Sequence, residues 1–274
     1  MVISSLKEIF LPKIKAKSTL PFSAADLQEV IKTNRNSLRD IDNWIDDDAF
    51  KKSWFNYGVP DFIRNDINKQ INQKPTYTDV MLLISKKYFS KLNYLEIGVS
   101  VGKNFFQLLN ASDDGAFFAF DIEEINPVLE RKLKFENETD WDTPSDSIKK
   151  SRSSFKKYRL NNKEVNYLCA DVWDSNSWAK LKGEKFNLIF SDALHSPEAI
   201  LFEFENLVKY DLLDERFVIV WDDLVGKMKR SFFKIIQKYN NVYKLQDIYL
   251  IDINGWIGEH EKPHSVGIIS NFSL

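Results

Sequence analysis

Five short apolar runs, each followed by a longer stretch with the apolar spacing of a helix, constrain the fold of this 274-residue chain more than any other feature. The runs occupy residues 94–97, 116–120, 165–169, 186–190 and 217–221. Runs of this length are typical of buried strands, and strands that alternate with helices form a parallel sheet covered by helices on both faces. The sequence therefore predicts an α/β fold.

The segments outside these runs predict three additions to the sheet. Residues 1–75 contain helix-start signals, such as Ser23 ahead of an apolar-periodic stretch, so we expect an N-terminal helical lead or cap before a domain at 76–274. Residues 131–160 are polar and charged, which indicates an insertion after the second strand. Residues 242–251 and 265–270 are joined by a connection too short for a crossover helix, which predicts an antiparallel terminal hairpin.

Charge and cysteine content exclude several classes of protein. Lys and Arg (38) nearly balance Asp and Glu (40), so the chain has no basic field to hold a nucleic acid or an anionic membrane, and we expect neither as a partner. The one cysteine, Cys169, excludes an internal disulfide and a multi-cysteine metal site. We interpret it as a core residue, and we expect a cytoplasmic protein without a signal peptide or a membrane span.

A turn with two glycines, Gly98 and Gly102, follows the first expected strand in the run Leu95-Glu-Ile-Gly-Val-Ser-Val-Gly-Lys103. Such a strand-to-helix turn offers free backbone N–H groups to a ligand at the carboxyl edge of the sheet. The spacing of its glycines and the Asn104 that follows Lys103 exclude a P-loop. A dinucleotide-binding fingerprint fits poorly too, because it needs glycine at position 100 and a small residue at position 103, where this chain has Ser100 and Lys103.

The remaining pattern, an acidic residue before Gly-x-x-x-Gly, resembles motif I of class I S-adenosylmethionine-dependent methyltransferases. Asp121 and Asp171, which end the second and third expected strands, also match the family, where such carboxylates accept from the ribose and from the adenine amine. The resemblance covers about residues 76–274 and implies a Rossmann-like methyltransferase fold with a mostly parallel seven-stranded sheet. The cofactor-binding residues that it implies are Glu96, Gly98, Ser100, Gly102, Asp121, Ile122, Asp171, Val172 and Asp192. We expect Gly98→Val to weaken cofactor binding and to leave the fold intact; an ordinary tight turn, with the aspartates as helix caps, is the alternative.

Carboxylates also end the fourth and fifth expected strands, at Asp192 and at Asp222-Asp223. The family's sheet order makes these strands neighbours, so the three carboxylates would converge and repel one another unless a cation such as Mg²⁺, Ca²⁺ or Mn²⁺ bridged them. Asp192-Ala-Leu-His195 and Asp222-Asp223 resemble metal-dependent O-methyltransferases, above all the bacterial enzymes that methylate sugar hydroxyls of macrolides. The resemblance implies a metal at Asp192, Asp222 and Asp223, and a catalytic role for His195 as base with Asp192. Alternatively, Asp222 and Asp223 cap the next helix and His195 is a solvated loop residue.

We therefore expect an S-adenosylmethionine-dependent O-methyltransferase that acts on a hydroxyl of a small molecule or saccharide with a divalent cation. A metal-independent methyltransferase for an amine or a carboxylate, a non-catalytic binding protein of the same fold and a nucleotide-dependent oxidoreductase are the alternatives. His260 and His264 are reserve bases. The aromatic cluster Trp54, Phe55 and Tyr57 either packs an acceptor or belongs to the core. The oligomeric state stays open, a homo-oligomer included.

Overall fold

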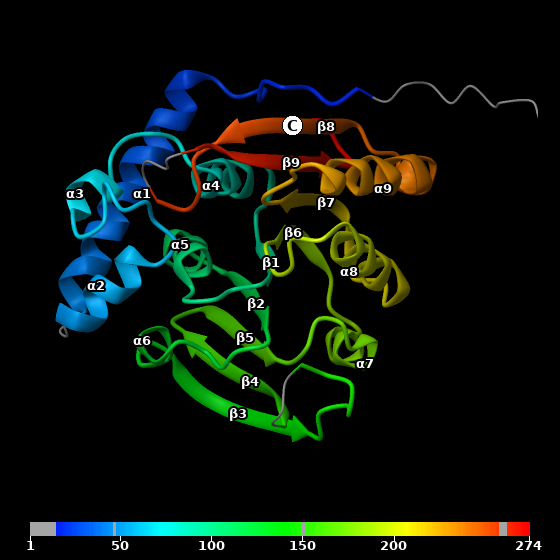
Figure 1. Ribbon diagram of the computed structural model, residues 1–274, viewed down its shortest axis with the longest axis horizontal. Coiled ribbons are helices and arrows are strands. Elements are labelled where there is room, and N and C mark those ends of the chain that lie inside the picture. The colour runs from blue at the N-terminus through cyan, green and yellow to red at the C-terminus, as the bar shows by residue number, and fades with distance from the viewer. Residues whose placement is uncertain (1–14, 46–47, 149–151, 258–261) are drawn as a thin grey trace, which may run out of the picture.

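A nine-stranded mixed sheet forms the centre of the computed structural model, which describes residues 15–45, 48–148, 152–257 and 262–274 (Figure 1). The strand order is β3-β4-β5-β2-β1-β6-β7-β9-β8. Its middle consists of five parallel strands: β5 (Lys163–Cys169), β2 (Gly115–Asp121), β1 (Leu92–Ile97), β6 (Phe186–Ser191) and β7 (Leu213–Trp221). These are the five strands that the apolar runs predict, so the α/β class is confirmed.

Antiparallel strands extend the sheet at both edges. Next to β7 lie β9 (His264–Ser270) and β8 (Asp247–Ile253), which form the expected terminal hairpin. Its first strand begins later than predicted, because residues 242 and 243 still belong to helix α9 (Lys227–Tyr243).

The seven-stranded sheet that the resemblance implies is wrong in strand number. The expected insertion contributes two further strands, β3 (Lys134–Trp141) and β4 (Ser153–Leu160), which pair antiparallel with each other and with β5. Almost every residue of β3 is exposed, and cross-strand ion pairs such as Arg159 to Glu136 at 2.8 Å link it to β4. A charged edge strand of this kind protects a sheet from further pairing, but it contains no apolar run that a sequence pattern could reveal.

Helices cover both faces of the sheet (Figure 1). On one face lie α7 (Ser175–Trp178), the short 3₁₀ helix Ala179–Leu181, α8 (Pro197–Lys209) and α9. On the other lie α4 (Tyr77–Tyr88), α5 (Lys103–Ala111) and α6 (Pro127–Glu130). Because side chains alternate along a strand, Tyr94 packs in the hydrophobic cluster under α4 and α5, and Leu95 packs in the cluster under α8 and α9.

The lead segment contains α1 (Ala24–Trp44), α2 (Asp48–Asn56) and α3 (Ile67–Gln70). Its buried side chains join the hydrophobic cluster of α4 and α5. A buried ion pair adds to this contact: the Arg35 guanidinium donates to both oxygens of Asp79, at 2.9 and 2.7 Å, while Asp79 also forms the capping box of α4 with Thr76. The lead therefore holds the first turn of α4 in place, although a domain division at residue 75 stays a prediction.

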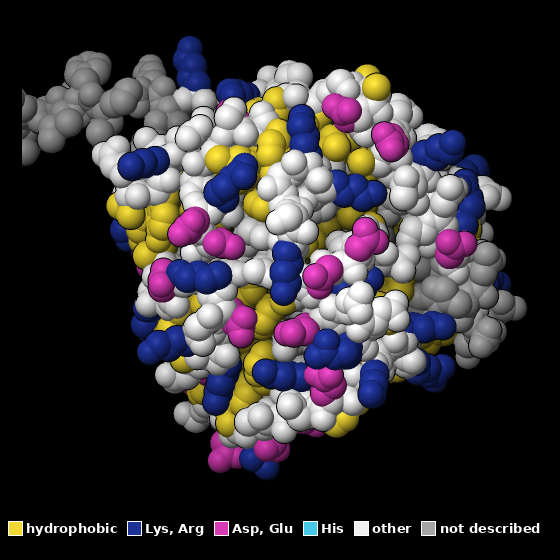
Figure 2. All heavy atoms as spheres, turned by 180° about the vertical axis from the view of Figure 1, so that it is seen from behind, with side chains coloured by type: hydrophobic (Ala, Val, Ile, Leu, Met, Phe, Trp, Pro, Cys, Tyr) yellow, Lys and Arg dark blue, Asp and Glu magenta, His cyan; other side chains and the backbone are white. Residues whose placement is uncertain are grey.

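The surface carries both signs of charge. On the face shown in Figure 2, Lys and Arg side chains are interspersed with Asp and Glu. No helix in the described part of the chain is both long and apolar enough to cross a membrane.

Candidate active site

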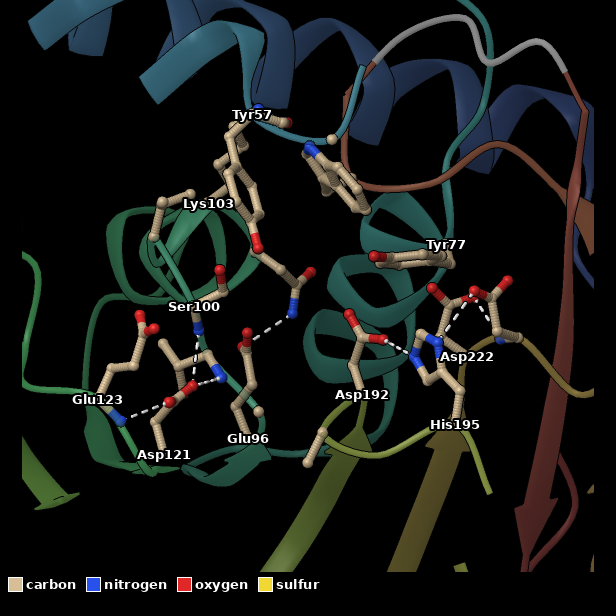
Figure 3. A pocket seen from close by; sticks show the side chains of 18 of the residues that line it. Tyr57, Tyr77, Glu96, Ser100, Lys103, Asp121, Glu123, Asp192, His195 and Asp222 are labelled. Carbon is tan, nitrogen blue, oxygen red and sulfur yellow. Dashed lines mark hydrogen bonds and ion pairs between the residues drawn. The ribbon is translucent and has the colours of Figure 1, made fainter. Parts of the chain in front are cut away.

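A cavity of about 660 Å³ lies at the carboxyl ends of β1, β2, β6 and β7 (Figure 3). The register explains why these strand ends meet: Ile97 pairs with Ser191, which pairs with Trp221, so the residues that follow all reach the same edge. A smaller cavity of about 170 Å³ adjoins it beyond Gly98 and Asp121. Ligands of open parallel sheets bind in this position.

Gly98 sits where two loops touch. Its φ is +82°, and a Cβ atom there would lie 2.4 Å from Cα of Ala193, in the loop after β6. The expectation that Gly98→Val leaves the fold intact is therefore wrong, because any side chain at this position displaces the backbone next to Asp192.

Asp121 organises the glycine turn from the end of β2. Its Oδ2 accepts from the backbone N–H groups of Val99 at 2.5 Å and Ser100 at 2.7 Å, and its Oδ1 accepts from that of Glu123 at 2.9 Å. Ser100 and Gly102 both have positive φ, and Gly102 is the N-cap of α5. The carboxylate thus fixes the turn and still lines the cavity.

Glu96 is buried beneath the turn. Tyr94 Oη at 2.6 Å and Asn104 Nδ2 at 2.8 Å both donate to its Oε2, and Oε1 accepts no hydrogen bond from the described residues. Burial raises the pKa of Glu96 to about 8, although both hydrogen bonds oppose the shift. A carboxyl group of this kind gains most from a cationic ligand group in the cavity.

Asp171 stands at the smaller cavity, whose other walls include Phe120, Ile122, Val172 and Ile148. Its Oδ2 accepts from Ser147 Oγ at 3.0 Å and from the N–H of Ile148 at 3.1 Å, and its Oδ1 accepts from the N–H of Trp173. The segment between β3 and β4 therefore reaches over the strand end at which the resemblance places the adenine. The largely apolar walls suit a flat ring.

Two histidines bridge three carboxylates at the other end of the main cavity. His195 Nε2 lies 2.9 Å from Asp192 Oδ1, and His195 Nδ1 lies 3.4 Å from Asp223 Oδ2. His264 Nδ1 lies 2.8 Å from Asp222 Oδ2 and 3.3 Å from Asp223 Oδ1. The sequence analysis placed His195 here and named His264 only as a reserve base.

The pKa values of His264, His195 and Asp192 are shifted in this cluster. Burial disfavours the charged form of His264, but hydrogen bonds to Asp222 and Asp223 outweigh it and raise its pKa to about 10. The hydrogen bond to Asp192 raises the pKa of His195. Burial raises the pKa of Asp192 to about 6, against the effect of His195. The neighbouring carboxylates thus stabilise the charged form of each imidazole relative to a histidine in water.

The donor atoms of Asp222, Asp223 and His264 lie within 4.8 Å of one another and could hold a metal ion. The two carboxylates offer the oxygen ligands that Mg²⁺ and Mn²⁺ prefer, and the imidazole is a donor more typical of transition metals. This group shares Asp222 and Asp223 with the expected ligand set and contains His264 where that set has Asp192, so the expected set stays a prediction. Asp222 and Asp223 do not cap α9, whose N-cap is Gly226.

Other sequence-named residues divide between the core and the cavity wall. Trp54, Phe55 and Cys169 are buried, whereas Tyr57 is half-exposed and lines the cavity. His260 lies outside the described residues. Wall residues that the sequence analysis did not assign to the site include Tyr77, Lys103, Asn104 and Trp256. Only Lys103 and Asn104 carried a signal, since they follow Gly102 directly.

Lys103 links the turn to the lead segment. Its Nζ donates to the carbonyl oxygens of Phe55 at 2.9 Å and Tyr57 at 2.5 Å. Burial lowers the pKa of Lys103 well below its usual value. The cavity therefore has carboxylates on its walls and a lysine whose charge burial disfavours.

No family model matches this chain, and neither does any curated protein. Among solved structures, TomG, an O-methyltransferase from Streptomyces achromogenes in complex with SAM, is 13% identical with a TM-score of 0.45, and the match covers 88% of either chain. The N-methyltransferase NodS from Bradyrhizobium japonicum, with SAH, is 12% identical with a TM-score of 0.45, over 90% of this chain and 100% of that one. MycE from the mycinamycin pathway, with Mg and SAH, is 10% identical with a TM-score of 0.43, over 93% and 55%. Methyltransferases, the class that the sequence resembles, thus recur among these structures. Their sequence identities and TM-scores are too low to assign an activity to this chain.

Proposed function

We propose that the protein is an S-adenosylmethionine-dependent O-methyltransferase that acts on a hydroxyl of a small molecule or saccharide with the help of a divalent cation. One observation carries the proposal. A single cavity has the glycine turn with Asp121 at one end and the cluster of two histidines and three carboxylates at the other. The first end suits the cofactor, and the second suits activation of a hydroxyl.

The charges of the cavity fit this cofactor. S-adenosylmethionine carries a sulfonium and an ammonium, and the wall offers Glu96, Asp121 and Asp192 to these positive groups and to the ribose hydroxyls. The smaller cavity beside Asp171 takes the adenine. An anionic acceptor would meet repulsion from the same carboxylates, so a neutral polyol is favoured, with Tyr57 and Trp256 as apolar surfaces beside it.

The reaction needs a positioned and deprotonated acceptor. A lone pair of the acceptor oxygen forms the new C–O bond while the C–S bond breaks and leaves its electron pair on sulfur. The acceptor proton passes to a base, for which we propose His195, oriented by Asp192 at 2.9 Å. A divalent cation held by Asp222, Asp223 and His264 would lower the pKa of the acceptor hydroxyl.

Calorimetry with S-adenosylhomocysteine tests the cofactor assignment without knowledge of the acceptor. Asp121→Asn is expected to weaken binding at least tenfold, about 1.4 kcal/mol, because it removes the charge that accepts from the turn and from the ribose. Glu123→Gln is the matched control, since it removes a neighbouring carboxylate of the same wall, and its affinity should stay within twofold. Wild-type affinity in Asp121→Asn would contradict the assignment.

A further inference from the structure

The hydroxyl of Tyr77 is a buried polar group that accepts and donates no hydrogen bond among the described residues. Tyr77 is 1% exposed and lines the main cavity, yet its Oη forms no hydrogen bond within the part of the chain that the structure describes. A buried hydroxyl without a hydrogen bond has lost its hydration without compensation, which destabilises the folded state. A hydroxyl of this kind in a cavity wall indicates that a bound ligand provides the missing interaction.

Two ring contacts and a backbone hydrogen bond hold Tyr77 in this orientation. It packs against Phe190 at 5.0 Å between ring centroids and edge-on against His264 at 5.8 Å. Its backbone N–H donates to the carbonyl of Asn254 at 2.9 Å. Tyr77 is also the first residue of α4, directly after the capping box that Asp79 and buried Arg35 hold in place. The position of the hydroxyl is therefore set before any ligand binds.

This position lies between the two halves of the site. In Figure 3 the hydroxyl points into the open middle of the cavity, toward the space between Glu96 and Asp192. Glu96 belongs to the half with the glycine turn, and Asp192 belongs to the half with the histidines. A methyl group that passes from a cofactor in the first half to an acceptor in the second must cross this space.

We propose that Tyr77 Oη contacts the methylsulfonium group of S-adenosylmethionine and directs an oxygen lone pair at its positive charge. The inference rests on the proposed function and adds a residue that recognises the transferable group. The contact distinguishes S-adenosylmethionine from its demethylated product, because a neutral thioether offers no positive group to the same oxygen. A weak C–H···O contact of this kind has a small energy, so a probe with a stronger donor at that position reveals it best.

Two ligands and two variants test the proposal by calorimetry. Sinefungin has an ammonium-bearing carbon in place of the methylsulfonium, whereas S-adenosylhomocysteine has only the thioether. Tyr77→Phe keeps the ring and removes the hydroxyl. Tyr249→Phe is the matched control, because it removes another buried tyrosine hydroxyl outside the cavity.

We expect Tyr77→Phe to lower the affinity for sinefungin at least fivefold and to keep the affinity for S-adenosylhomocysteine within twofold of wild type. Tyr249→Phe should change neither affinity by more than twofold. Sinefungin affinity within twofold of wild type in Tyr77→Phe would overturn the proposal, and so would an equal loss for both ligands, which indicates a structural role. A wild-type protein that binds neither ligand would overturn the proposed function itself, and this inference with it.

Discussion

Glu203 makes the stability of the protein depend on pH in an unusual direction. It lies on α8 at 1% exposure and accepts from Ser191 Oγ at 2.5 Å, and its second oxygen, Oε1, has no hydrogen-bond partner among the described residues. Burial raises the pKa of Glu203 from 4.5 to about 8. The folded protein therefore binds this proton more tightly than the unfolded chain does.

The sign of the effect follows from linkage. A carboxyl with a raised pKa in the folded state contributes stability that is complete below pH 4.5 and is lost as the pH rises through 8. The difference between the pKa of 4.5 in the unfolded chain and about 8 in the folded protein, at about 1.4 kcal/mol per pH unit, corresponds to a loss of about 5 kcal/mol over that window. Glu96 contributes in the same window, since burial also raises its pKa to about 8.

A neutral substitution isolates Glu203. Glu203→Gln should unfold with a flatter pH dependence than wild type between pH 5 and 8.5, and it should be the more stable protein at the upper end. Urea denaturation followed by tryptophan fluorescence gives the free energy of unfolding at each pH. Glu205→Gln on the same helix is the control, because Glu205 is exposed and pairs with Lys238. Parallel curves for wild type and Glu203→Gln would refute the reasoning.

Three further changes test other parts of the structure. Arg35→Ala leaves Asp79 buried without its cation and should cost about 3–5 kcal/mol of stability, whereas exposed Arg39→Ala should cost under about 0.5 kcal/mol; equal urea midpoints would contradict this. Asp222→Asn should weaken Mn²⁺ binding at least tenfold in calorimetry and Asp192→Asn by no more than threefold, because only Asp222 belongs to the group with His264; equal losses would favour the ligand set expected from the sequence. His195→Ala should lower kcat of methyl transfer by about 10²–10⁴ with S-adenosylhomocysteine affinity unchanged, and an unaffected kcat would assign the base elsewhere.

The parallel half of the sheet was predictable because burial on both faces demands continuous apolar runs. The same reasoning failed for β3 and β4. The strand at 134–141 lies at the edge of the sheet and is exposed to solvent, so it consists mainly of polar and charged residues and has no apolar run. The end-of-strand aspartates Asp121, Asp192 and Asp222 were predictable for a related reason: each directly follows or ends a buried run.

The partners of these aspartates depend on register, which the sequence pattern does not contain. His264 reaches Asp222 because β9 runs antiparallel to β7 with Gly267 opposite Trp221, which places the start of β9 beside the end of β7. Tyr77 is the first residue of α4, whose first turn contacts the lead segment through Asp79 and Arg35. Neither residue belongs to a motif that marks it in advance.

A crystal structure with S-adenosylhomocysteine tests the central claim most directly. We predict density in the main cavity with the ribose at Asp121, the adenine in the smaller cavity beside Asp171 and Val172, and the sulfur near Tyr77 Oη. A protein that binds no S-adenosylhomocysteine at millimolar concentration, or that binds it away from the Gly98 turn, would contradict the account.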